Sequence, residues 1–260
     1  MRPRNLKGKR RKWVVPTVLC LGIILVPAVS LAVTVIEYGQ MISLMSNTLV
    51  VHDETYQVEG TMIYGTEYVG GTTGTMVQNG NANLAFSLVL GDEPGSSGTY
   101  NLSGGGLLGG NEYIGYNGTG TFIQSGGTNG TPTEIFFDTN LFLGYNPGSK
   151  GTYELQNGTL AAASEFIGLA GTGTFTQNGG THTVNNLFVG AGIHSRGTYN
   201  LEGGTLSAGS IEVDSTGSFN VSGGTLTVTG NVVNAGTIKT TNAEVIWVGE
   251  VTIETGGLYV

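Results

Sequence analysis

The chain has 260 residues, of which 46 are glycine and only 6 are proline, and its formal net charge is −8 at pH 7. Because 39% of the residues are apolar, the chain is too apolar for simple disorder, and its many Gly, Thr and Asn residues are typical of an all-β protein rich in turns. Seven of the ten basic residues lie between Arg2 and Lys12, whereas all eighteen acidic residues lie from Glu37 onward. The part after Val33 therefore carries three basic and eighteen acidic residues, a net charge of −15, which disfavours binding to nucleic acid or to an anionic membrane surface.

Residues 1–32 have the pattern of a secretory signal peptide, with a basic start, an apolar stretch and the small-x-small triplet Ser30-Leu31-Ala32 at its end. The uncharged run from Trp13 to Ile36 has 24 residues, which is long enough to span a bilayer, so an uncleaved anchor helix reaching to about residue 36 is the alternative. Both alternatives predict export of the remaining chain. Cleavage would remove Cys20, so disulfides could not stabilise the mature protein.

Residues 33–53 are predicted to be a lead-in segment, and residues 54–260 are predicted to be a repeat domain. A Gly-Thr-aromatic frame recurs at intervals of 19 to 31 residues. Its threonine or serine positions are Thr55, Thr75, Thr99, Thr121, Thr152, Thr174, Thr198, Ser218 and Thr237. Each repeat holds two short alternating segments separated by Gly-rich turns, and neither segment can bury its apolar face alone.

Stacking of successive repeats solves this problem and predicts a parallel β-solenoid of about 9 to 10 coils, with a rise of about 4.8 Å per coil. In the frame GTYNL, the aromatic residue and the fifth residue point to the inside. The predicted inner column is Tyr56, Met76, Tyr100, Phe122, Tyr153, Phe175, Tyr199, Phe219 and Ile238.

The fifth residue of the frame alternates between two kinds. The coils with inner Phe122 and Phe175 carry Gln at this position, Gln124 and Gln177, whereas coils with Tyr mostly carry Leu. A buried Gln needs hydrogen-bond partners. One hypothesis is that its amide pairs with a tyrosine hydroxyl of the adjacent coil, which makes the structural unit a double coil of roughly 46 residues. The other is that the Gln side chain reaches the backbone of a turn.

The strings GTYNLSGG, NNLFVG and LGYNPGSKGTY resemble a repeat family of bacterial secreted proteins, found in autotransporter-type passengers and in surface proteins with a PEP-CTERM sorting signal. The resemblance covers about residues 54 to 235. It implies a β-solenoid stalk or passenger at the cell surface, with adhesive or matrix-forming roles. A C-terminal membrane barrel and a Pro-Glu-Pro motif, which complete members carry, are not seen in this sequence.

No catalytic, cofactor-binding or metal-binding residues are predicted. The acidic residues are scattered, and Glu67, Glu112 and Glu165 recur just before an aromatic residue, as a solvated column would. None of the three histidines has a metal-ligand neighbour at a useful spacing. A non-catalytic structural or adhesive protein is therefore expected.

The longest coil contains an extra segment in which Glu134, Phe136, Phe137 and Asp138 form a possible partner-binding loop; an apolar bulge packed on the stack is the alternative. If this loop is used, the second functional hypothesis is a glycan-binding or glycan-cleaving solenoid that acts through residues 129–140. Expected partners are surface glycans or another copy of the chain. Leu258 and Tyr259 stand near the end of the sequence without a polar cap, so either the open end stacks on another copy of the chain, or the 260 residues are the N-terminal part of a longer protein in which the repeats continue.

Overall fold

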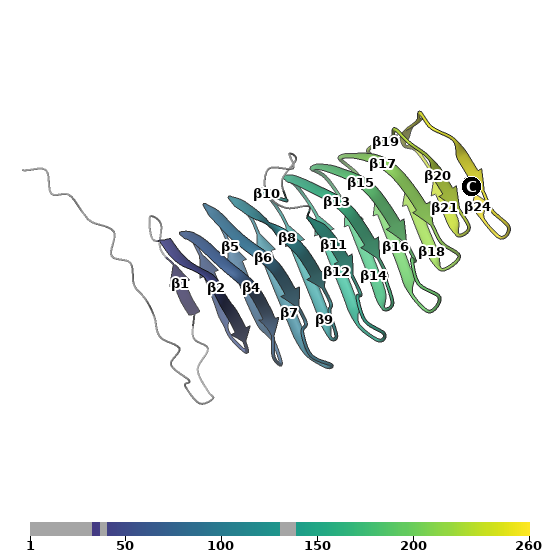
Figure 1. Cartoon of the computed structure of the whole chain (residues 1–260). Coiled ribbons are helices and arrows are strands. Elements are labelled where there is room, and N and C mark those ends of the chain that lie inside the picture. The colour runs from purple at the N-terminus through teal and green to yellow at the C-terminus, as the bar shows by residue number, and fades with distance from the viewer. Residues whose placement is uncertain (1–32, 37–40, 131–138) are drawn as a thin grey trace, which may run out of the picture.

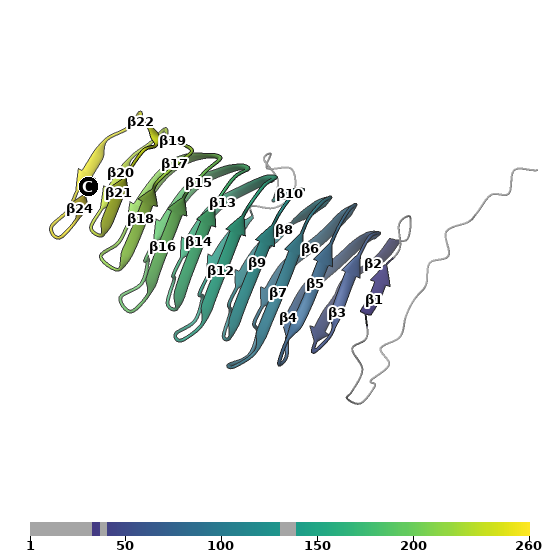
Figure 2. The ribbon, with the colours of Figure 1, turned by 180° about the vertical axis from the view of Figure 1, so that it is seen from behind.

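The chain winds into a parallel β-solenoid in which two sheets lie face to face (Figure 1). The computed structural model describes residues 33–36, 41–130 and 139–260, with side chains from Thr48 onward. About nine coils follow one another, and the view from behind shows the same stepwise order from β1 to β24 (Figure 2). The predicted all-β solenoid is confirmed, while the expected N-terminal helix falls outside the described residues. Within those residues, no helix has the length and apolarity needed to cross a membrane.

The first sheet has eleven strands, all parallel to their neighbours. In spatial order they are β1 (Val33–Ile36), β3 (Thr55–Val58), β5 (Gly74–Gln78), β7 (Ser97–Leu102), β9 (Thr119–Gln124), β12 (Lys150–Leu155), β14 (Thr172–Gln177), β16 (Arg196–Leu201), β18 (Gly217–Val221), β21 (Thr237–Thr240) and β24 (Leu258–Tyr259). The threonines of the Gly-Thr-aromatic frame pair in register from coil to coil, as Thr152 does with Thr121 and Thr174.

The second sheet has thirteen strands. They are β2 (Met41–His52), β4 (Thr61–Gly70), β6 (Ala82–Leu90), β8 (Gly106–Ile114), β10 (Thr128–Asn129), β11 (Asn140–Leu143), β13 (Thr159–Ile167), β15 (Thr181–Val189), β17 (Thr205–Val213), β19 (Thr225–Val228), β20 (Val232–Asn234), β22 (Glu244–Trp247) and β23 (Val251–Ile253). Strands β10 and β11 belong to one coil, because both pair with β8 and with β13. Strands β1 and β2 lie in the segment 33–53 and pair with β3 and β4, so a coil of the same kind stands before the first predicted repeat.

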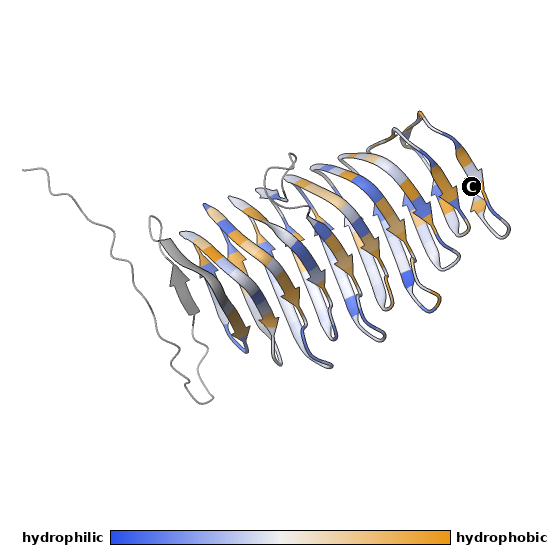
Figure 3. Ribbon diagram, in the orientation of Figure 1, coloured by the Kyte–Doolittle hydropathy of each residue, from blue (hydrophilic) through white to orange (hydrophobic). Residues whose placement is uncertain are grey.

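The core lies between the two sheets and contains the predicted aromatic column. The rings of Tyr100, Phe122, Tyr153, Phe175 and Tyr199 are fully buried and stack in order, with neighbouring centroids 4.6 to 5.0 Å apart. Apolar and polar residues alternate along the strands (Figure 3), as expected where one face of a strand is buried and the other is solvated. Equivalent positions of successive coils lie side by side. Residues that recur at one position of the repeat therefore form a continuous stack along the solenoid.

The longer strands of the second sheet contain a point where the inside–outside alternation shifts by one position. In β4, Met62 and Tyr64 are buried, residues 65–66 are both half-buried, and Glu67 and Val69 are buried again. Two successive residues therefore face away from the core. The shift decides which side chains of the following segment point inward.

Glycines at the turns allow the coils to approach each other closely. Gly115 has φ +76°, a left-handed conformation that favours glycine, and a Cβ atom there would lie only 2.0 Å from the carbonyl oxygen of Lys150, the first residue of β12. The recurrence of glycine in the turns thus follows from the spacing of the coils.

Candidate functional site

The residues expected to form a partner-binding loop, Glu134, Phe136, Phe137 and Asp138, lie outside the described residues, in the segment between β10 and β11. The polar groups that the structure does bring together lie elsewhere, inside the solenoid.

Glu67, Glu112 and Glu165 are buried, so the expectation of a solvated glutamate column is wrong. Their exposed fractions are 0%, 3% and 0%. The shift of alternation within the strands of the second sheet turns the glutamate inward and the following aromatic residue outward. In the paired register, the glutamates alternate with leucines of the coils between them, namely Leu88, Leu141 and Leu187. Carboxyl groups therefore occur only in every second coil, about 9.6 Å apart along the rod.

The first buried polar network joins three successive coils. Tyr100 in β7 donates from its hydroxyl to Gln78 Oε1 over 2.6 Å. Asn83 in β6 donates to the Tyr100 hydroxyl at 2.9 Å and to Glu67 Oε2 in β4 at 3.0 Å. One amide thus bridges a tyrosine of the coil after it and a glutamate of the coil before it.

The second network repeats this arrangement two coils further along. Tyr153 donates to Gln124 Oε1 over 2.6 Å, and Asn129 donates to the Tyr153 hydroxyl and to Glu112 Oε2, both over 3.0 Å. The repeat distance of the networks is two coils, because the Gln and Asn side chains come from the Phe or Met coils and the Tyr and Glu side chains come from the others.

Both hypotheses for the inward glutamines are confirmed, since each amide uses its two ends differently. The Oε1 atom accepts from a tyrosine, and the Nε2 atom donates to the backbone. Gln177 Nε2, for example, donates to the carbonyl oxygen of Gly180, in the turn after β14, over 3.4 Å, and to the carbonyl oxygen of Thr205, at the start of β17, over 3.0 Å. Gln78, Gln124 and Gln177 are all fully buried.

The third network has a histidine in place of the asparagine. His182 lies with Nδ1 2.8 Å from the Tyr199 hydroxyl and Nε2 2.8 Å from Glu165 Oε1, and Tyr199 donates to Gln177 Oε1 over 2.8 Å. Because the tyrosine proton is used toward Gln177, Nδ1 must carry the hydrogen that is donated to the tyrosine oxygen. One further proton is then shared between Nε2 and the Glu165 carboxyl.

The two asparagine networks leave acceptor atoms without partners. Glu67 Oε1, Glu112 Oε1, and the Oδ1 atoms of Asn83 and Asn129 are buried and make no hydrogen bond. Desolvation by burial raises the pKa of Glu67 and of Glu112 from 4.5 to about 7, against the lowering effect of the Asn donor. An ionised carboxylate is thus costly at either position.

Burial also raises the pKa of the three tyrosine hydroxyls, those of Tyr100, Tyr153 and Tyr199, well above its usual value. Each hydroxyl therefore remains a proton donor to its glutamine. The donor–acceptor order of all three networks is fixed by this proton.

The Glu165–His182–Tyr199 chain has the order of an acid–base relay, but all three residues are 0% exposed. No molecule in solvent reaches these groups while the coil is folded. The observed geometry therefore supports a role in holding coils together.

On the outside of the second sheet, aromatic rings form another stack. Tyr113, Phe142, Phe166 and Phe188 follow one another at centroid distances of 5.0, 5.1 and 4.8 Å, and Tyr145 meets Tyr113 edge-on. All are half-buried. Within this outer aromatic stack each ring face is covered by the next ring, so mainly edges are open to solvent.

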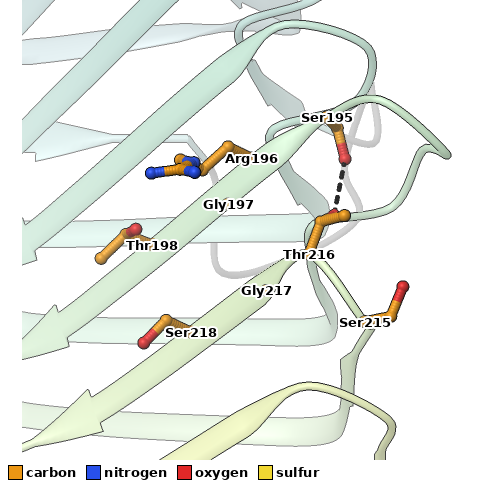
Figure 4. Close-up of a pocket in the computed structure, with 8 residues that line it drawn as sticks. All are labelled: Ser195, Arg196, Gly197, Thr198, Ser215, Thr216, Gly217 and Ser218. Atoms are coloured by element: carbon orange, nitrogen blue, oxygen red, sulfur yellow. Dashed lines mark hydrogen bonds between the residues drawn. The ribbon is translucent and has the colours of Figure 1, made fainter. Parts of the chain in front are cut away.

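A hollow of about 400 Å³ lies where two neighbouring turns differ in length. The turn before β16 has six residues (190–195), whereas the turn before β18 has three (214–216), which leaves a step in the surface. Figure 4 shows the hydroxyls of Ser195 and Thr216 facing each other there, 3.2 Å apart, with Arg196 on the adjoining strand. The lining is polar and open to solvent.

The remaining histidines do not form a metal site in the described part of the chain. His52 lies 3.0 Å from Asp92 Oδ2, and His194 is exposed in the turn before β16. No group of three or more His, Cys, Asp or Glu residues with metal-binding geometry occurs among the described residues. Comparisons of the chain with protein-family models, curated proteins and solved structures found no match.

Proposed function

We propose that this chain is a non-catalytic structural β-solenoid of the bacterial cell exterior, which serves as a stalk, passenger or matrix element with an adhesive surface. The observation that carries this proposal is where the polar groups lie: the three glutamate networks connect coil to coil in the core and are closed to solvent. Such groups stabilise a rod and fix its register. The resemblance of the repeats to secreted surface proteins, and the signal-like N-terminal segment, support an extracellular location.

Location and adhesion are tested on producing cells. We expect an antibody against the solenoid to label intact cells without permeabilisation, and external protease to remove the label. Cells that lack the gene should attach less well to surfaces or to each other, and re-expression should restore attachment. Label that appears only after permeabilisation would contradict the proposed location, and unchanged attachment would contradict the adhesive role.

A further inference from the structure

The three buried networks differ in whether the side chain that bridges tyrosine and glutamate can carry a positive charge. The Asn83 and Asn129 amides are neutral, whereas His182 can carry a positive charge beside its carboxylate. In the described part of the chain, the lysines and the arginine, namely Lys150, Arg196 and Lys239, are all exposed. Glu67 and Glu112 therefore have no cation inside the core to balance an ionised carboxylate.

The groups around these two carboxyls are acids or neutral donors. Glu67 is near Tyr100 of β7, Tyr64 of its own strand and Tyr56 of β3, and Glu112 is near Tyr153 of β12. Glu112 also lies between two other carboxyls, Glu67 and Glu165, one on each side along the rod, and both disfavour its ionisation.

We propose that the core of the solenoid takes up protons at Glu67 and Glu112 as it folds, so that the rod is most stable in mildly acidic surroundings and weakens as the medium becomes neutral. A proton on each carboxyl removes the uncompensated buried charge. It also gives each carboxyl an O–H donor, in a region where the buried acceptor atoms Asn83 Oδ1 and Asn129 Oδ1 have no hydrogen-bond partner. In the third network, the imidazole Nε2 of His182 instead lies 2.8 Å from Glu165 Oε1.

The direction of the pH effect follows from linkage. In the folded chain the pKa of both carboxyls is about 7, whereas an unfolded glutamate titrates near 4.5, so the folded chain binds more protons between these values. The stabilising contribution is complete below about pH 4.5 and is lost as the pH rises through 7. Unfolding at pH 6 should release about two protons from these sites.

Denaturant unfolding of the full chain at pH 5 and pH 8 tests the proposal. The unfolding midpoint of the wild type should be lower at pH 8. The double variant Glu67→Gln/Glu112→Gln keeps the size of both side chains but cannot ionise, so its midpoint should change much less between the two pH values. Glu202→Gln, at an exposed position, is the matched control and should retain the full wild-type change. A wild-type midpoint that does not fall, or a double variant that falls equally, would overturn the proposal.

Exchange of the bridging residues gives an independent test. His182→Asn converts the third network into the form of the other two, so a third carboxyl should join the titration and the fall in midpoint should become steeper. Asn129→His should make it shallower, because an imidazolium would then face Glu112. Identical pH profiles for both variants and the wild type would contradict the assigned roles.

If a variant fails to fold, the titration of the two carboxyls can be measured in the wild-type chain. With ¹³C-labelled glutamate side chains, two carboxyl resonances are expected to titrate near pH 7. If all of the glutamate resonances titrate below about pH 5.5, the proposal is wrong.

Discussion

Each tyrosine hydroxyl in the buried networks has a fixed place between one acceptor and one donor. Tyr199, for example, donates to Gln177 and accepts from His182, and both partners come from the coil before it. A buried polar group that loses its partner is left desolvated without compensation, which costs about 1–3 kcal/mol. The fit between neighbouring coils thus depends on individual side chains.

Gln177→Leu is expected to lower the free energy of unfolding by about 1–3 kcal/mol, because the Tyr199 hydroxyl loses its acceptor and the carbonyl oxygen of Thr205 loses a donor. Urea unfolding followed by circular dichroism measures the effect. Gln156, an exposed glutamine just after β12 in the preceding coil, provides the control, since Gln156→Leu should change the stability by no more than about 0.5 kcal/mol. Equal effects of the two substitutions would show that the tyrosine bond contributes nothing.

The tyrosine–glutamine pairs could be predicted from the sequence because both residues stand in one short frame with strict alternation. The glutamates could not be placed correctly, since the segments EYVG, EYIG and EFIG suggest by ordinary alternation that the aromatic residue is inside. The extra outward residue at positions 65–66 and its equivalents reverses this assignment. A signal was present at His182, Asn83 and Asn129, which are polar residues at a position where the neighbouring coils have Met62, Leu107, Leu160 and Leu206.

Among the strands, the first sheet depends on glycine just before the frame Thr or Ser, which occurs at every frame position except Thr55, where Glu54 precedes. At Gly98 in β7, an added Cβ atom would lie 1.9 Å from the carbonyl oxygen of Val69 in β4. A backbone atom cannot move aside as a flexible side chain can. The strand spacing therefore excludes any side chain at this position.

Gly98→Ala is expected to lower the free energy of unfolding by about 1–3 kcal/mol, because the coils must separate locally to admit the methyl group. Gly80 is the matched control, since a Cβ atom there meets nothing within 4 Å. Thermal unfolding of the two variants measures the difference. A Gly98→Ala protein as stable as Gly80→Ala would mean that the coils are less closely spaced than described.

For the whole molecule, the fold and the stacking of the coils could be predicted from the repeat. The contacts of the first and last described coils could not, because the repeat describes only coils that have a neighbour on both sides. The last described coil exposes apolar side chains. Val248, Ile253, Leu258 and Val260 have exposed fractions of 67%, 50%, 52% and 59%. Strand β24 pairs only with β21 within the described residues, so its other edge is open there.

We expect a purified protein of these 260 residues to self-associate as its concentration rises, because strand β24 offers this open edge to another copy. Leu258→Lys/Val260→Lys should suppress association, because charged side chains on an open edge oppose strand pairing. Sedimentation velocity over a range of concentrations measures this. A wild-type chain that stays monomeric at high concentration would contradict end-to-end stacking.

The buried networks group the coils in pairs and fix the order in which the coils stack. Two deletions of different length compare this arrangement with one in which all coils are equivalent. Deletion of residues 153–198 removes two coils and places Tyr199 where Tyr153 stood, so that Gln124 and Asn129 regain a tyrosine hydroxyl. Deletion of residues 175–198 removes one coil and leaves Glu165 and Tyr199 without Gln177 and His182.

Urea midpoints of the two deleted proteins are the measurement. If coils were equivalent, the longer deletion would cost more stability, because a shorter repeat array has fewer coil interfaces. If the coils work in pairs, the opposite is expected: the protein without residues 153–198 should unfold at a higher urea concentration than the protein without residues 175–198. A lower midpoint for the longer deletion would contradict the account.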